Sequence, residues 1–204
     1  MNTPEFFEQA PAITLYDPLA EFLGAAEGGR LHYRYVDAVK TAGHSCPTVA
    51  SAWLMTLRAL EALYPDSLPE RGAVRAEFSQ EWTSGVTGVI ANIVSLLTGA
   101  TRDTGFKGLA GRFDRRNLLA FNTGRESDIR FIRQDTAAAV DVTSFLEYVP
   151  GNPLMRELMP FCVAGQADEQ MQREFSRLWQ ERVRSLLLDY ADDPRVIVVT
   201  PVAA

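Results

Sequence analysis

The sequence contains few of the residues that bind soft metal ions. Cys46 and Cys162 are its two cysteines, and His32 and His44 are its two histidines, in 204 residues. Two cysteines cannot form the framework of several disulfides that stabilises small secreted domains. In a reducing cytosol we expect these cysteines to be free thiols or metal ligands.

Positive charge and long apolar runs are also scarce. The chain has 20 Lys and Arg against 26 Asp and Glu, which gives a net charge of −6. A general nucleic-acid binder is disfavoured, because contacts to phosphates need clustered basic residues. No run approaches the roughly 20 apolar residues that span a bilayer, and the N-terminus lacks the features of a signal peptide. We therefore expect a cytoplasmic protein with no membrane or nucleic-acid partner.

The remaining composition and its periodicity favour a globular domain. Hydrophobic residues make up 47% of the chain, enough for a sizeable core. Helical patterns and strand patterns are mixed without strict alternation, which indicates an α+β fold with a mixed sheet. We predict one domain over 1–204, with an N-terminal helical arm over about 1–29 and a C-terminal helix plus strand over about 168–200. The predicted helices cover 18–23, 47–63, 85–101 and 168–190, and the predicted strands cover 71–78, 117–121, 129–133, 138–142 and 196–200. Residues 30–43, RLHYRYVDAVKTAG, alternate and then turn into a short helix.

The stretch GHSCP, residues 43–47, places His44 two positions before Cys46. Pro47 is suited to the first turn of the helix that follows, so both side chains lie at a helix N-terminus. Free N–H groups and a partial positive charge there favour the thiolate, which is the form that binds metals. Imidazole and thiolate suit zinc, nickel, iron or copper. We therefore predict that His44 and Cys46 are metal ligands.

Two protein ligands do not complete a metal site. The others would come from His32, from a carboxylate such as Glu77 or Glu81, from a partner subunit, or from a cofactor. Haem is one such cofactor, because a single axial ligand from the protein is sufficient. His32 has a second interpretation, as a surface histidine on an edge strand.

The same turn has two other interpretations. Cys46 can be a small buried apolar residue, with His44 capping the turn. It can also be a nucleophile whose base is His44. We disfavour the nucleophile, because residues two apart in a turn are rarely expected to aim an imidazole at the neighbouring sulfur.

A loop rich in glycine and basic residues follows the second apolar helix, over residues 102–116. Glycine lets the backbone approach a ligand, and guanidinium groups match carboxylates and phosphates. The loop lacks the spacing of a Walker motif. We predict that it binds a small anion or anionic substrate, with Asn92, Lys107, Arg112 and Arg115 as the binding residues. The alternative is a surface loop that packs against a dimer partner.

The order of GHSCP (43–47), TGAT (98–101) and GFKG (105–108) resembles the core domain of the family named after the E component of formylmethanofuran dehydrogenase, over roughly residues 30–125. The resemblance implies an α+β core, an intertwined homodimer, and a metal site at the histidine and cysteine of the first motif. The sequence departs from the family where Val89, Asn92 and Ala100 replace two cysteines and an aspartate. The zinc ribbon of some relatives is also missing, because only Cys162 follows Cys46.

These observations lead to one expected function and two alternatives. We expect a protein that binds a transition metal or a metal cofactor such as haem, and acts in metal or cofactor handling or sensing. The first alternative is a metal- or thiolate-dependent enzyme that acts on a small anionic substrate. The second is a structural dimer without a bound metal.

Overall fold

The computed structural model describes residues 3–203 and has the α+β architecture that the sequence predicts. Met1, Asn2 and Ala204, which belong to the predicted arm and domain, lie outside the described residues. The helices are α1 (Pro18–Phe22), α2 (Tyr35–Ala42), α3 (Pro47–Leu63), α4 (Thr87–Thr98), α5 (Pro153–Val163) and α6 (Glu169–Arg184). The strands are β1 (Ile13–Tyr16), β2 (Arg30–Tyr33), β3 (Val74–Phe78), β4 (Leu119–Ala120), β5 (Ile129–Arg133), β6 (Ala139–Ser144) and β7 (Ile197–Val202).

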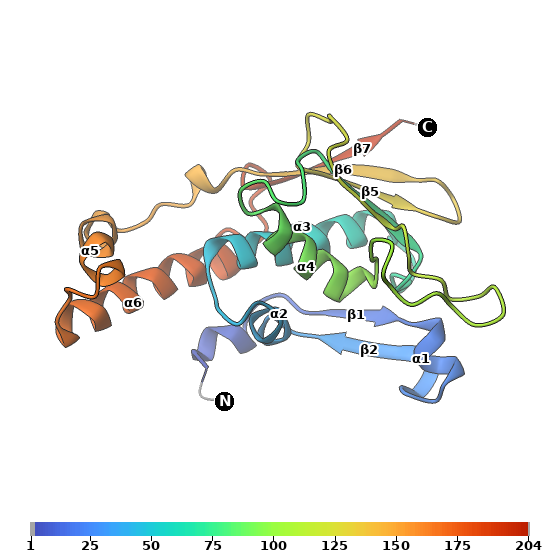
Figure 1. The fold of residues 1–204 in the computed structure, drawn as a ribbon, viewed down its shortest axis with the longest axis horizontal. Helices are drawn as coiled ribbons and strands as arrows, with labels where there is room; N and C mark the ends of the chain where they lie inside the picture. The colour runs from blue at the N-terminus through green and yellow to red at the C-terminus, as the bar shows by residue number, and fades with distance from the viewer. Residues whose placement is uncertain (1–2, 204) are drawn as a thin grey trace.

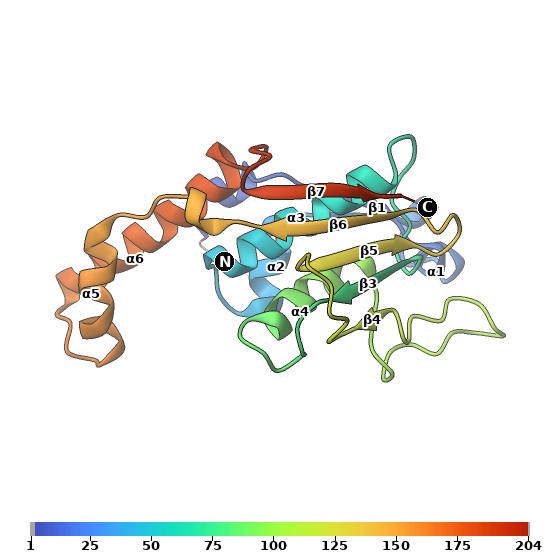
Figure 2. The ribbon, with the colours of Figure 1, turned by 90° about the horizontal axis from the view of Figure 1, so that it is seen from above.

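The strands form two sheets. Five of them are ordered β4-β3-β5-β6-β7, with β3 and β4 parallel and the other neighbours antiparallel. β1 and β2 form a separate antiparallel pair. In Figure 1, α3 and α4 lie between the five-stranded sheet and this pair, while α5 and α6 extend together from one end. Figure 2 shows the five-stranded sheet spread over these helices.

The central helix α3 has the bounds that the sequence predicts. Pro47 is its first residue, and Cys46 is its N-cap. The apolar side chains that recur at helical spacing along it are buried: Val49, Trp53, Leu54, Leu57, Leu60 and Leu63. A helix of 17 residues is about 25 Å long, so α3 separates features at its two ends by about that distance.

Two elements were not predicted from the sequence. β1 lies within the predicted helical arm, and it pairs with β2 through the register Ile13↔Tyr33 to Tyr16↔Arg30. α5 contains Pro160, a residue that usually marks the end of a helix. Asn152 nevertheless accepts a hydrogen bond from the N–H of Leu154, and Pro153 occupies the first position of α5.

Two predicted elements are shorter than expected. The strand over 117–121 is reduced to Leu119–Ala120, which pair with β3. The α-helical part of the predicted helix 168–190 ends at Arg184, and a π-helical turn, Ser185–Asp189, follows. None of the helices in residues 3–203 is long and apolar enough to cross a membrane.

Candidate functional site

The GHSCP turn connects α2 to α3, and its shape follows from its residue types. Gly43 ends α2 in the left-handed conformation, with φ of 76°, which glycine adopts without a steric penalty. Cys46 is the N-cap of α3, and its Sγ accepts the N–H of Val49 at 3.4 Å. A sulfur in this position replaces the hydroxyl or carboxylate oxygen that usually caps a helix.

His44 and Cys46 approach each other closely. The Nε2 atom of His44 lies 3.3 Å from Sγ of Cys46, and its Nδ1 lies 3.0 Å from the carbonyl oxygen of Ala42. Because a carbonyl only accepts hydrogen bonds, Nδ1 is the donor to Ala42, and Nε2 is the ring nitrogen that faces the sulfur. The expectation that an i, i+2 spacing rarely aims the imidazole at the sulfur was wrong for this turn.

The two side chains differ in exposure. Cys46 is 8% exposed, whereas His44 is an exposed residue. The sulfur is thus covered by protein on most sides, while the imidazole beside it is open to solvent. A ligand that reaches both atoms would approach from the side of the ring.

Three side chains from other segments hold the turn through Ser45. Trp179 Nε1 and Gln180 Nε2, both in α6, donate to the Ser45 carbonyl oxygen at 3.0 and 3.1 Å. The Tyr35 hydroxyl lies 3.0 Å from Ser45 Oγ. Tyr35 is fully buried, and burial raises its pKa above the ordinary value, so the phenol stays protonated at neutral pH. These contacts fix the backbone between His44 and Cys46.

Sequence reasoning did not find these three side chains. Trp179 and Gln180 are more than 130 positions from Ser45, and no local pattern connects them to it. Tyr35 is only ten positions away, but it stands in an alternating sequence pattern where the structure forms α2. One signal was present, since an aromatic residue with a polar atom, when buried, usually finds a hydrogen-bond partner.

The other proposed metal ligands lie elsewhere. His32 Nδ1 is 3.1 Å from Thr14 Oγ1 across the β1–β2 pair. Glu77 on β3 forms an ion pair with Arg125, whose Nε lies 2.9 Å from its carboxylate. Within residues 3–203, no group of three or more His, Cys, Asp or Glu side chains is arranged to hold a metal ion. In this part of the chain, the structure thus brings together His44 and Cys46 and leaves His32 apart.

The four predicted anion-binding residues do not form one group. Asn92 lines a pocket with Trp82 and Arg102, whereas Arg112 and Arg115 line a different cavity. Lys107 is exposed and lines neither of the two. Figure 1 places the loop that carries Arg112 at the end of the core opposite the α2–α3 turn. The loop and the His44–Cys46 pair therefore do not share a pocket.

Comparison of the sequence with models of known protein families and with curated proteins gives no match.

Proposed function

We propose that the protein binds a transition metal ion, or a metal cofactor such as haem, through Cys46 and His44, and acts in metal or cofactor handling or sensing. The observation that carries this proposal is the distance of 3.3 Å between Sγ and Nε2. A tetrahedral ion bound to one thiolate at about 2.3 Å and one imidazole at about 2.0–2.1 Å holds the two atoms about 3.5 Å apart. The pair therefore needs only a small adjustment to bind one ion.

The surroundings of the pair support metal binding. The hydrogen bond of Nδ1 to the Ala42 carbonyl leaves Nε2 as the ligating nitrogen, as in many metal sites where a second partner orients the histidine. The N–H of Val49 and the N-terminus of α3 favour negative charge on Sγ. The resemblance of GHSCP to the metal-binding motif of the formylmethanofuran dehydrogenase family points to the same two residues.

Further ligands would come from outside this pair. A bound small molecule, a cofactor with its own donors, or a second copy of the chain can supply them. For haem, either Cys46 or His44 alone would serve as the axial ligand. The chemistry that such a group would supply depends on the metal, and the role of this chain is to present one soft and one borderline donor.

We also propose that the protein is a homodimer in the cytoplasm. Support comes from the α5–α6 hairpin, which extends beyond the core in Figure 1 and exposes apolar side chains. Val163 is 82% exposed and Phe161 48% exposed. Light scattering on the wild type and on Val163→Glu tests the dimer, with Gln170→Glu as a control on the same hairpin. A wild-type protein with the mass of one chain would refute the dimer.

The alternative function is a thiol-dependent enzyme. The specific observation in its favour is the order of contacts from Cys46 Sγ to His44 Nε2 and from His44 Nδ1 to the Ala42 carbonyl. This order matches a nucleophile, its base and a group that orients the base. Such a pair would let His44 take the proton of the Cys46 thiol and hold it, which leaves the thiolate as the nucleophile.

One set of measurements tests both functions. Protein purified without a metal-affinity tag is analysed for metals and by absorption spectroscopy, before and after exposure to zinc, nickel, copper, iron or haem. For a metal protein we expect about one ion or haem per chain, with loss in Cys46→Ala and in His44→Ala. His32→Ala serves as the control, because it removes the other histidine and should keep the metal. A wild type that binds none of these ions and no haem would refute metal binding.

Alkylation of the metal-free protein by iodoacetamide tests the enzyme alternative. Mass spectrometry of the two cysteine peptides reports Cys46 and Cys162 separately, so Cys162 serves as an internal control. If His44 is the base of Cys46, His44→Ala should slow alkylation of Cys46 at neutral pH by about a hundredfold or more, within the usual range of base catalysis. Equal rates in the wild type and His44→Ala would refute the base role.

A further inference from the structure

The TGAT motif, residues 98–101, holds in place the loop that carries Arg112 and Arg115. Gly99 ends α4 with φ of 70°, and a Cβ at this position would lie 2.7 Å from Nη1 of Arg115 and 3.2 Å from Cγ of Arg71. Only glycine leaves room for these two side chains. Two positions later, the backbone N–H and the hydroxyl of Thr101 both donate to the Arg115 carbonyl oxygen, at 2.9 and 2.7 Å. The motif therefore fixes Arg115 against the end of α4.

The GFKG stretch shapes the same loop. A Cβ on Gly108 would lie 2.2 Å from the carbonyl oxygen of Arg112, so the chain folds back tightly here. Leu109 and Arg112 exchange two backbone hydrogen bonds of 2.9 Å, which form a small hairpin. Phe113 then takes φ of 65°, an uncommon conformation for a bulky residue. Such strained positions cluster at ligand-binding sites.

Beneath the loop, one carboxylate faces two guanidinium groups. Asp17 is 3% exposed and accepts hydrogen bonds from Arg115 Nη2 at 2.7 Å and from Arg71 Nη1 at 3.1 Å. Burial alone would raise the pKa of Asp17, but the hydrogen bonds from Arg115, the backbone N–H of Ala20 and Arg71 lower it below the ordinary value. Asp17 is therefore ionised at neutral pH, and this group of three keeps one positive charge in excess.

One donor of this group has no partner. Arg115 is 7% exposed, yet its Nε is buried and hydrogen-bonds to nothing in residues 3–203. This atom lies beside Gly72, where a Cβ would be 3.4 Å from Nε. A buried donor left without a partner is costly unless a ligand or water satisfies it.

Arg112 adds a second positive charge at the mouth of the cavity. Its guanidinium lies 4.6 Å from the ring centroid of Phe113 and 5.9 Å from that of Phe22, and it forms no ion pair with the described residues. Stacking on Phe113 holds the group in place and leaves its N–H edge free to donate.

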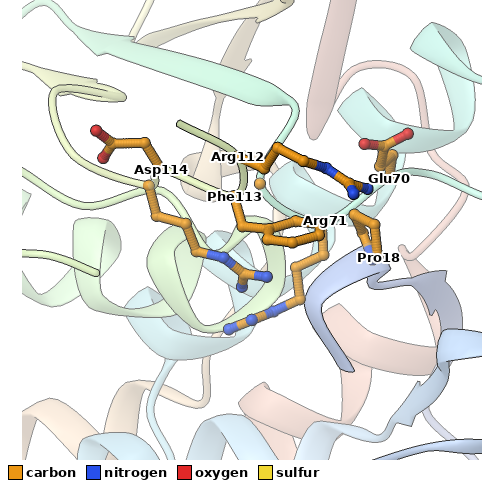
Figure 3. Close-up of a pocket in the computed structure, with 8 residues that line it drawn as sticks. Pro18, Glu70, Arg71, Arg112, Phe113 and Asp114 are labelled. Atoms are coloured by element: carbon orange, nitrogen blue, oxygen red, sulfur yellow. The ribbon is translucent and has the colours of Figure 1, made fainter. Parts of the chain in front are cut away.

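The carboxylates at the cavity do not cancel these charges. Asp114 is bound by Arg116 through contacts of 2.6 and 3.0 Å, and in Figure 3 it points away from the other labelled side chains. The other carboxylate in the lining is Glu70, which lies on the side of Arg112 and Pro18 in the same view. Three arginines therefore line the cavity. Of the two carboxylates that line it, Glu70 is the one without a hydrogen bond to an arginine of the described residues.

We propose that this cavity, of about 330 Å³ and lined by Arg71, Gly72, Arg112, Phe113 and Arg115, binds a small dianionic oxyanion, either a phosphate group or a dicarboxylate. Arg112 would bind the anion at the mouth, and the unpartnered Nε of Arg115 would bind it from within. Planar guanidinium groups match two oxygens of one such anion. The site is independent of metal binding, because Cys46 lies at the other end of α3.

Calorimetric titration with inorganic phosphate, succinate and acetate tests the proposal. Arg112→Gln is the informative variant, because Arg112 is exposed and its loss should leave the fold intact. Arg116→Gln is the matched control in the same loop, since Arg116 is held by Asp114 and does not line the cavity. Glu70→Gln removes a negative charge from the lining and should strengthen binding.

For the wild type we expect phosphate or succinate to bind at least about tenfold more tightly than acetate, because a second negative charge meets a second guanidinium. Arg112→Gln should weaken binding about tenfold or more, while Arg116→Gln stays within about twofold of the wild type. A preference between phosphate and succinate identifies the class of ligand. The proposal is overturned if neither dianion binds at concentrations up to about 10 mM, or if Arg112→Gln binds as tightly as the wild type.

Discussion

The His44–Cys46 turn lies at one end of α3, and the cavity lined by Arg71, Arg112 and Arg115, the arginine cavity, lies at the other. The two regions are built in different ways. In the turn, the two chemical groups are two residues apart and meet through local backbone geometry. At the cavity, two of the lining residues, Arg71 and Arg115, bind the buried Asp17, which is 54 and 98 positions away from them. A close pair of side chains can therefore arise from local backbone geometry, whereas balanced buried charge needs the whole fold.

Of the substitutions that compare the two regions, replacement of Asp17 should cause the largest loss in the free energy of unfolding. Asp17→Asn leaves Arg71 and Arg115 without their carboxylate, and breaking a buried ion pair from one side costs about 3–5 kcal/mol. Urea unfolding measures the loss. Asp114→Asn, which breaks an exposed pair, should cost far less. Equal stabilities of the wild type and Asp17→Asn would show that the cavity does not depend on this carboxylate.

The stability that Asp17 provides should also depend on pH. Its pKa is lower in the folded protein, so its contribution is present above the unfolded pKa of about 3.9 and is lost as pH falls through the folded value. The difference in unfolding free energy between the wild type and Asp17→Asn should therefore be widest near neutral pH and narrow below about pH 4. Denaturation curves at several pH values measure it, and a difference that is constant down to about pH 2 would contradict the assignment.

A matched pair of glycines compares the two regions directly. Gly43 and Gly99 both end a helix in the left-handed conformation, but a Cβ meets no atom within 4 Å at Gly43 and meets Arg115 and Arg71 at Gly99. Gly43→Ala should cost only the backbone strain, about 1–2 kcal/mol. Gly99→Ala should cost at least about 1 kcal/mol more, because packing strain is added. Thermal unfolding of both variants tests this order, and a larger loss at Gly43 would reverse it.

The smallest effect should come from the hydrogen bond that holds the turn. Tyr35→Phe removes the hydroxyl beside Ser45 Oγ and keeps the ring buried between Phe7 and Trp53. We expect a loss of about 1 kcal/mol in the free energy of unfolding. Anion binding at the far end of α3 should be unchanged. A change in phosphate or succinate affinity would show that the two regions are coupled.

The elements that were predicted well carry strong local signals. α3 has Pro47 at its start and an apolar face at helical spacing, so its bounds and its buried side follow from local chemistry. α5 and β1 were not predicted, for two different reasons. Pro160 suggests a break where the helix continues, and β1 gains its identity only through pairing with β2. The π-helical turn after Arg184 likewise has no local signature.

The candidate sites show the same contrast between features with a local sequence signal and features that depend on long-range contacts. His44 and Cys46 were chosen from their spacing, while the distance between Nε2 and Sγ had to be measured in three dimensions. Arg112 and Arg115, which were predicted to bind one anion, line the same cavity. Asn92 was added as a polar residue of the second apolar helix, and it lines a different pocket. Lys107 was added from the loop sequence, which does not fix the direction of its side chain. Arg71 was missed, because it reaches the cavity only when α4 and the N-cap residue of α1, Asp17, are in place.

The helices with strong caps, the buried face of α3, and the histidine and cysteine at its N-terminus all follow from short stretches of sequence. Backbone sterics, side-chain periodicity and helix capping act over a few residues, so they can be deduced locally. The folded chain is needed to see that Trp179 and Gln180 hold the turn, and that Asp17, Arg71 and Arg115 share one buried site. Hydrogen bonds and ion pairs of this kind depend on the distance between side chains in space, which chain separation does not specify.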